Sequence, residues 1–129
     1  MKKRIKAAVI EDEPHSLEFI LGIIEIFFPS IQITGFSENL KTGLTIINNH
    51  KPDLIFADIE LPDGNGLIFP EMISDMNPDY HPIFIFISAN DSYMKMIDPQ
   101  NSYFLTKPVQ IKLLEKIMEQ ISNKLMQAN

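Results

Sequence analysis

Short apolar runs alternate along the chain with stretches in which apolar residues recur at helical spacing. The apolar runs predict β-strands at 6–10, 31–36, 54–57, 83–87 and 103–106. The periodic stretches predict helices between these runs and after the last one. They lie at about 14–28, 37–47, 67–76, 92–97 and 114–125.

The runs at 6–10, 54–57 and 83–87 are apolar throughout rather than alternating with polar residues. This pattern is typical of strands that are covered on both faces, and it indicates a parallel sheet between two layers of helices. Strands and helices alternate as five βα units, which predicts an α/β protein with a doubly wound five-stranded parallel sheet.

Local signals at the helix ends fit this interpretation. Pro14 suits the first turn of a helix, and Ser37 is a candidate N-cap for the second helix. Pro70 is compatible with the third helix only in its first turn, where backbone amides lack partners. Asp98 followed by Pro99 is expected to end a short fourth helix.

Polar side chains stand at the end of four predicted strands. Glu11 and Asp12 follow the first run, and Asp58 follows the run at 54–57. Ser88 and Lys107 come directly after the runs at 83–87 and 103–106. Because the carboxyl ends of parallel strands share one edge of a sheet, where such folds bind their ligands, we expect these groups to meet.

These residue types suit a divalent cation and a phosphoryl group. The carboxylates of Glu11, Asp12 and Asp58 would raise one another's pKa unless a cation neutralises them. Hard oxygen ligands favour Mg²⁺, and the backbone carbonyl of Glu60 is placed to complete its coordination. Cysteine is absent from the chain, which disfavours a zinc site.

Asp58 is the candidate nucleophile, because a carboxylate can attack phosphorus and form an acyl phosphate. Its predicted strand is central in the sheet. Lys107 would offer a positive charge to the phosphoryl oxygens, and Ser88 could donate its hydroxyl to one of them. Asp12 alone could equally cap the first helix, and Ser88 alone could cap the fourth.

Composition limits the function classes. At 129 residues the chain fits a single domain spanning 1–129, with 45% hydrophobic residues, which is enough for a core. The net charge of −6, without a basic stripe, argues against direct binding of nucleic acid. No apolar run is long enough for a membrane span, and acidic residues at 11–13 interrupt any signal peptide. The absence of cysteine fits a reducing cytoplasm, which is the location we expect.

The combined motifs resemble the receiver domain of bacterial two-component response regulators. The matching pieces extend over about residues 5–126: Ile10-Glu11-Asp12-Glu13, Asp58 with Pro62 and Gly66, Ile87-Ser88-Ala89, and Lys107-Pro108. The resemblance implies a flavodoxin-like (βα)5 sheet with strand order 2-1-3-4-5.

The same resemblance implies that Asp58 accepts phosphate from a partner histidine kinase or phosphotransfer protein. Glu11, Asp12, Asp58 and the Glu60 carbonyl would hold Mg²⁺. Such a chain is a signalling domain that assists its own phosphorylation and dephosphorylation, not a metabolic enzyme.

Phe104 stands three residues before Lys107, at the position of the family's switch aromatic. The resemblance implies that Ser88 moves toward the phosphoryl group and that Phe104 turns inward. The face made by the fourth helix, fifth strand and fifth helix would then change its preference for an output domain, a partner protein or a second copy in a homodimer.

The sequence also departs from the family pattern. Asn65 replaces a usually acidic residue, the stretch from Ser88 to Lys107 is short, and Pro99 lies where the fourth helix would continue. The segment from Ser88 to Tyr93 is similar to receivers that precede LytTR-type DNA-binding domains.

Two other function classes remain open at this point. One is a pseudo-receiver, a protein-binding module that keeps the fold without being phosphorylated. The other is a Mg²⁺-dependent phosphatase or phosphotransferase, although 129 residues leave no room for the cap domain that would enclose a small substrate.

Overall fold

A five-stranded parallel sheet forms the centre of this computed structural model, which describes residues 4–127. The strands lie in the order β2-β1-β3-β6-β7. Because β4 and β5 form a separate two-stranded sheet, this order is the predicted 2-1-3-4-5 arrangement, and the fold prediction is confirmed. The strands of the large sheet are β1 (Ile5–Ile10), β2 (Ile31–Ser37), β3 (Leu54–Asp58), β6 (Ile83–Ser88) and β7 (Ser102–Thr106).

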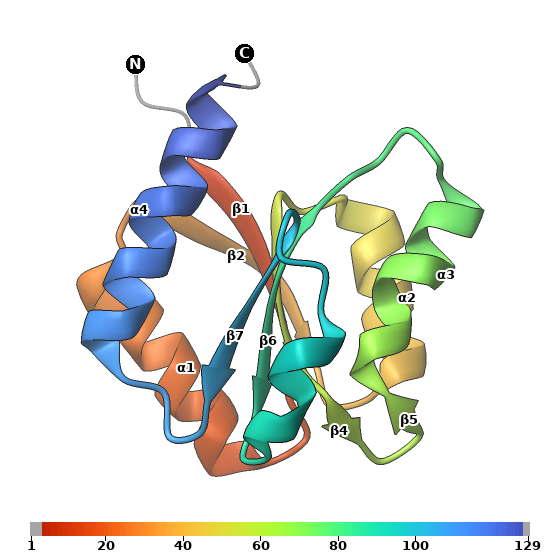
Figure 1. The fold of residues 1–129 in the computed structure, drawn as a ribbon, viewed down its shortest axis with the longest axis horizontal. Helices are drawn as coiled ribbons and strands as arrows, with labels where there is room; N and C mark the ends of the chain where they lie inside the picture. Colours follow the sequence, from red (N-terminus) through yellow and green to blue (C-terminus); the bar gives the residue numbers. More distant parts are fainter. Residues whose placement is uncertain (1–3, 128–129) are drawn as a thin grey trace.

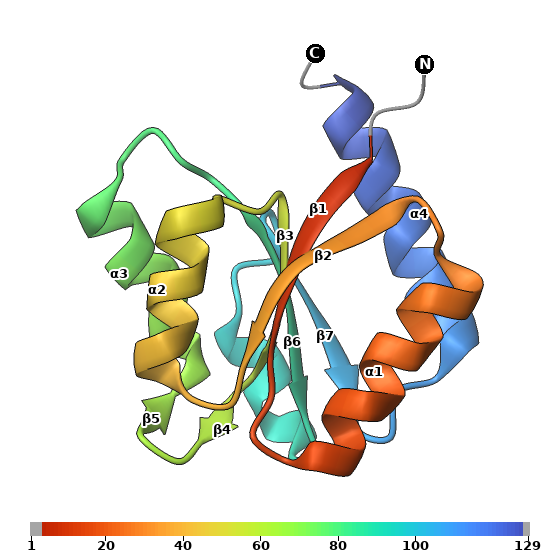
Figure 2. The ribbon, with the colours of Figure 1, turned by 180° about the vertical axis from the view of Figure 1, so that it is seen from behind.

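Helices cover both faces of this sheet (Figures 1 and 2). The remaining elements are α1 (Pro14–Phe27), α2 (Leu40–His50), β4 (Glu60–Leu61), β5 (Gly64–Asn65), the 3-10 helix η1 (Gly66–Ile68), α3 (Phe69–Met76), the 3-10 helix η2 (Asp91–Met96) and α4 (Ile111–Gln127). Helices α1 and α4 pack on one face, whereas α2, α3 and η2 lie on the other (Figure 1).

The core therefore has two parts, one on each side of the sheet. Phe56 packs in the part beneath α1 and α4, and its neighbours Ile55 and Ala57 pack in the part beneath α2 and α3. Successive side chains of a strand point to opposite faces, so a strand covered on both sides must be apolar throughout. This explains the continuous apolar runs in the sequence.

Side chains cap both α1 and α2, but these are not the side chains that the sequence suggested. The carboxylate of Glu13 accepts hydrogen bonds from the backbone N–H groups of His15 and Ser16, at 3.1 and 2.7 Å. The alternative in which Asp12 caps α1 is therefore wrong, since Glu13 fills that position. Asp12 is left exposed at the end of β1.

The cap of α2 lies two residues later than predicted. Asn39, not Ser37, is the N-cap, and its side-chain oxygen accepts a hydrogen bond from the backbone N–H of Thr42 at 2.9 Å. The hydroxyl of Ser37 instead accepts from the backbone N–H of Asn39 at 3.2 Å. Ser37 thus holds the capping residue in place rather than capping the helix itself.

The segment predicted as a helix at 92–97 is a 3-10 helix, η2, capped by Asn90 rather than Ser88. The backbone becomes extended at Ile97, with φ −89° and ψ 156°. Pro99 disfavours helical backbone at Asp98, so the chain cannot continue as a helix there. The third predicted helix begins at Phe69, after η1, and Pro70 lies in its first turn as expected.

One close backbone approach fixes the loop that follows β3. The backbone N–H of Gly66 donates to the carbonyl of Ile59 at 2.7 Å. A Cβ atom at Gly66 would lie 2.2 Å from the carbonyl oxygen of Asp58. Only glycine allows this contact without a backbone shift.

We therefore expect Gly66→Ala to destabilise the protein by roughly 2–4 kcal/mol, measured as the free energy of unfolding in urea. Gly22→Ala is the matched control, because nothing lies within 4 Å of a Cβ at Gly22 in α1. This change should stabilise α1 by up to about 1 kcal/mol. Equal stability of the two variants would contradict the proposed close contact.

Candidate functional site

The carboxyl ends of β1, β3, β6 and β7 bring the polar residues together at one edge of the sheet, the lower edge in Figure 1. Asp58 is the last residue of the central strand β3 and Ser88 is the last residue of β6. Glu11 and Asp12 follow β1, and Lys107 follows β7. Residues far apart in the chain thus meet at the edge of the sheet that the sequence predicted.

The ammonium group of Lys107 joins two carboxylates. Its Nζ lies 2.7 Å from Glu11 Oε1 and 3.1 Å from Asp58 Oδ2. Glu11 is only 1% exposed and Asp58 only 4%. The backbone N–H of Lys107 donates to the carbonyl of Ser88 at 2.9 Å, which fixes the chain beside β6.

Backbone amides orient the other oxygen of each carboxylate. The N–H of Glu13 donates to Glu11 Oε2 at 3.1 Å, and the N–H of Glu60 donates to Asp58 Oδ1 at 3.1 Å. In both cases the amide lies two residues after the acid. Each acid therefore has one oxygen held by its own loop and one oxygen facing Lys107.

Burial, together with a hydrogen bond and the charge of the nearby Glu11 carboxyl, raises the pKa of Asp58 from its ordinary value to about 6. Lys107 opposes these effects only in part. Burial by itself would lower the pKa of Lys107, but its contacts with Glu11 and Asp58 outweigh burial and raise it. Lys107 is thus firmly cationic, whereas Asp58 is an easily protonated acid.

Glu11, Asp12 and Asp58 fit a divalent cation. One carboxylate oxygen from each lies within 4.8 Å of the others. Asp12 is exposed to solvent, whereas the other two are buried, so an ion could bind with water on its open side. Three carboxylates and one nearby ammonium group leave a negative charge that Mg²⁺ would neutralise. The Glu60 carbonyl remains a predicted ligand.

Ser88 and the side chain of Glu60 form a contact that the sequence did not suggest. The hydroxyl of Ser88 donates to Glu60 Oε1 at 3.1 Å and accepts from the backbone N–H of Asn90 at 3.0 Å. From the sequence, only the backbone carbonyl of Glu60 was a candidate for the site. The Glu60 side chain meets Ser88 from a different strand end, and such a contact leaves no local pattern in the sequence. Ser88 itself is 1% exposed.

Phe104 lies on β7 beside Phe86 of β6 in the strand register. It is half-buried and packs against the core beneath α2 and α3. The ring therefore sits near the surface in this structure. Its predicted inward turn stays a prediction.

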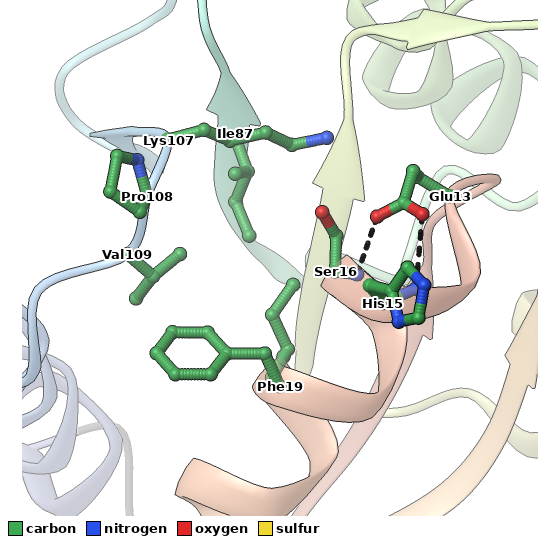
Figure 3. A pocket seen from close by; sticks show the side chains of 9 residues that line it. Glu13, His15, Ser16, Phe19, Ile87, Lys107, Pro108 and Val109 are labelled. Carbon is green, nitrogen blue, oxygen red and sulfur yellow. Dashed lines mark hydrogen bonds between the residues drawn. The ribbon is translucent and has the colours of Figure 1, made fainter.

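A hollow of about 460 Å³ adjoins Lys107, between α1 and the chain after β7 (Figure 3). Phe19 faces Pro108 and Val109 across it, and Ile87 lies at its inner end. Phe19 is 49% exposed although it is aromatic. This surface was not predicted from the sequence, although an outward phenylalanine on the first predicted helix was a signal for it.

The strand order and the acidic cluster at the strand ends agree with one class of protein, the two-component signalling domains. The family model of the response regulator receiver domain matches residues 7–119. The chain belongs to this family, whose members are phosphoacceptor signalling domains rather than metabolic enzymes. The resemblance to receiver domains drawn from the sequence is confirmed.

Individual relatives agree with the family assignment. An uncharacterised response regulatory protein of Vibrio vulnificus is 33% identical over 119 residues, which is 92% of this chain and 48% of the relative. The transcriptional regulatory protein BtsR of Escherichia coli K12 is 29% identical over 91% of this chain and 48% of its own length. The chain thus spans about half the length of these curated relatives.

The fold also matches solved structures. The signal receiver domain of NarL from Mycobacterium tuberculosis superposes with a TM-score of 0.78, covering 94% of this chain and 98% of that domain. At 17% identity this match supports the fold alone. Among residues 4–127, no helix combines the length and apolar character needed to cross a membrane.

The raised pKa of Asp58 predicts how stability depends on pH without metal. Between about pH 4 and pH 6 the native state holds a proton on Asp58 that the unfolded state has lost, so stability falls as pH rises. In chelator, Asp58→Asn should be more stable than the wild type by about 1–2 kcal/mol at about pH 8. The difference should vanish below about pH 4.

Urea unfolding at a series of pH values measures this difference. Asp75→Asn is the control, because Asp75 is exposed on α3 and the same change should leave the pH dependence unaltered. An Asp58→Asn protein less stable than the wild type at high pH would contradict the raised pKa of the buried Asp58 carboxylate.

Proposed function

We propose that this domain accepts a phosphoryl group on Asp58 from a phosphohistidine of a partner histidine kinase or phosphotransfer protein, in a Mg²⁺-dependent reaction. The observation that carries the proposal is the pair of contacts of Lys107 with Asp58 and Glu11, at the carboxyl end of the central strand. Family membership supports the same reading.

Asp58 is suited to attack phosphorus. Its Oδ1 is held by the backbone N–H of Glu60, so its side chain is oriented before the donor arrives. In the transfer, an Asp58 oxygen forms a bond to phosphorus while the phosphorus–nitrogen bond of the donor breaks. The electron pair of the broken bond stays on the imidazole nitrogen.

After the transfer, Lys107 would contact the phosphoryl group. Its ammonium group already lies 3.1 Å from Asp58 Oδ2, so it can bind an oxygen of the phosphoryl group added there. Mg²⁺ bound by Glu11, Asp12, Asp58 and the Glu60 carbonyl would supply further positive charge toward the phosphoryl oxygens. The exposed side of Asp12 leaves room for donor and water. Hydrolysis of the acyl phosphate by water would reset the domain.

The hollow beside Lys107 supports docking of the phosphodonor protein (Figure 3). Phe19 and Pro108 are exposed there, next to the ammonium group that faces Asp58. A donor helix resting on these apolar residues would bring its phosphohistidine to the strand ends.

Switching would begin at Ser88. Its hydroxyl is engaged by the Glu60 carboxylate, so a phosphoryl group on Asp58 would compete with Glu60 for the same proton donor. Movement of Ser88 would also break its bond with the backbone N–H of Asn90, the cap of η2. Space vacated near β6 would let Phe104 turn inward. The surface of η2, β7 and α4 would change as a result.

The relatives' greater length supports an output domain beyond the receiver. Curated relatives are about twice as long as this chain, and BtsR is a transcriptional regulatory protein by name. We therefore infer that residues 1–129 act as one receiver domain that controls an output domain of the LytTR type or a partner protein. We further propose that two copies of the domain form a homodimer through the surface of η2, β7 and α4. We also propose a cytoplasmic location.

The phosphorylation assignment is tested with a small phosphodonor, acetyl phosphate, in the presence and absence of Mg²⁺. We expect intact-mass labelling of the wild type by one phosphoryl group, dependent on Mg²⁺, and no labelling of Asp58→Asn. Asp75→Asn should be labelled like the wild type. Labelling of Asp58→Asn would show that Asp58 is not the residue that accepts the phosphoryl group. An unlabelled wild type would favour the pseudo-receiver.

The switch is tested by following the Phe104 ring by NMR before and after addition of beryllofluoride, a stable mimic of the phosphoryl group. In the wild type, resonances of Phe104 and η2 should shift together. Ser88→Ala should still bind beryllofluoride at Asp58 but lose most of the Phe104 shift, because the hydroxyl that moves is gone. A full shift in Ser88→Ala would exclude Ser88 as the moving group.

A further inference from the structure

A second hollow lies between α3 and the chain that follows η2. It is on the opposite side of the sheet from the hollow beside Lys107. Its volume is about 350 Å³. The hollow, which we call the α3 groove, exists because η2 is a short 3-10 helix and the backbone is extended at Ile97. Ile73, Phe84 and Phe86 form its apolar floor.

Ser102 supplies a polar side chain in the α3 groove. Ser102 begins β7, pairs in register with Phe84 and is only 5% exposed. It lines the groove, where its hydroxyl can donate and accept hydrogen bonds. A polar group of a bound molecule could therefore bond to this hydroxyl.

The rim of the α3 groove is acidic on both walls. Glu71 stands on the α3 wall and Asp98 on the wall after η2. Among the described residues that line the groove there is no lysine or arginine, and His81 is the only basic side chain. Carboxylates on both sides of an apolar floor are complementary to a segment with an apolar face flanked by cations.

Methionine extends the apolar surface at the groove edge. Met96 lines the groove and is 64% exposed, and Met94 on the same short helix is 52% exposed. Methionine side chains adapt to different partners and are common on surfaces that bind amphipathic helices. Two exposed methionines beside a partly apolar hollow form a surface that suits an apolar partner segment.

We propose that the α3 groove binds a basic amphipathic helix of a partner protein. The apolar face of the helix would lie on the floor and against Met96, and lysine or arginine side chains beside that face would pair with Glu71 and Asp98. A polar side chain of the helix would bond to the Ser102 hydroxyl. This proposal does not require phosphoryl transfer at Asp58, but a change at Ser88 that reaches η2 would alter the wall that Met96 forms.

The test uses a leucine/lysine peptide of about 15 residues, long enough to form an amphipathic helix. It is titrated into ¹⁵N-labelled protein with Mg²⁺ present, so that the carboxylates near Asp58 are neutralised. The matched control peptide has glutamate in place of lysine. We expect the lysine peptide alone to bind, with the largest shifts at the backbone amides of Ser74, Met96 and Ser102.

Two pairs of variants locate the binding. Ser74→Trp places a large ring in the groove from an exposed position on α3 and should weaken binding roughly tenfold, whereas Asp75→Trp, beside it but outside the groove lining, should not. Glu71→Lys should weaken binding several-fold. The same change at exposed Glu18 on α1 should leave the affinity unaltered.

Other outcomes would overturn the proposal. Absence of binding, equal binding of the glutamate peptide, or shifts centred on Glu11, Asp12 and Asp58 would each remove the groove as the binding site. Self-association of the protein that Ser74→Trp abolishes would show that a second copy, not a partner helix, occupies the groove.

Discussion

Two buried carboxylates share one ammonium group at the carboxyl edge of the sheet. Glu11 and Asp58 each lose most of their contact with water, and Lys107 bonds to both. A buried ion pair seldom stabilises a fold, because desolvation offsets the attraction between the charges. Here the acids outnumber the cation, so the arrangement leaves a negative charge unbalanced. The site is therefore prepared for a further cation and for an electron-rich phosphoryl group held next to it.

The parallel sheet makes this arrangement possible. Each βα unit returns its next strand in the same direction, so strand ends far apart in the chain meet at one edge. Backbone amides two residues after Glu11 and Asp58 then hold each carboxylate in place. The loop after β3 is fixed in turn by the backbone contact at Gly66. The chemistry at Asp58 thus depends on loop geometry as much as on side chains.

Ser88 links the site to the rest of the domain. It bonds to the Glu60 carboxylate on one side and to the backbone of Asn90, which caps η2, on the other. A change at Asp58 can therefore reach η2 through one hydroxyl. The shortness of η2 has a second effect, because it leaves the α3 groove between its end and α3. The same short segment shapes both the switch surface and the groove.

The sequence by itself determined the strands, the parallel arrangement and the meeting of Glu11, Asp58 and Lys107. Apolar periodicity and strand-end residues are local features, and the rule that parallel strands end at one edge converts them into a site. Only the tertiary structure decided that Glu13 caps α1, that Glu60 engages Ser88, and that a groove opens beside α3. Such contacts join segments distant in the chain or depend on exact loop paths, so no local pattern of residues specifies them.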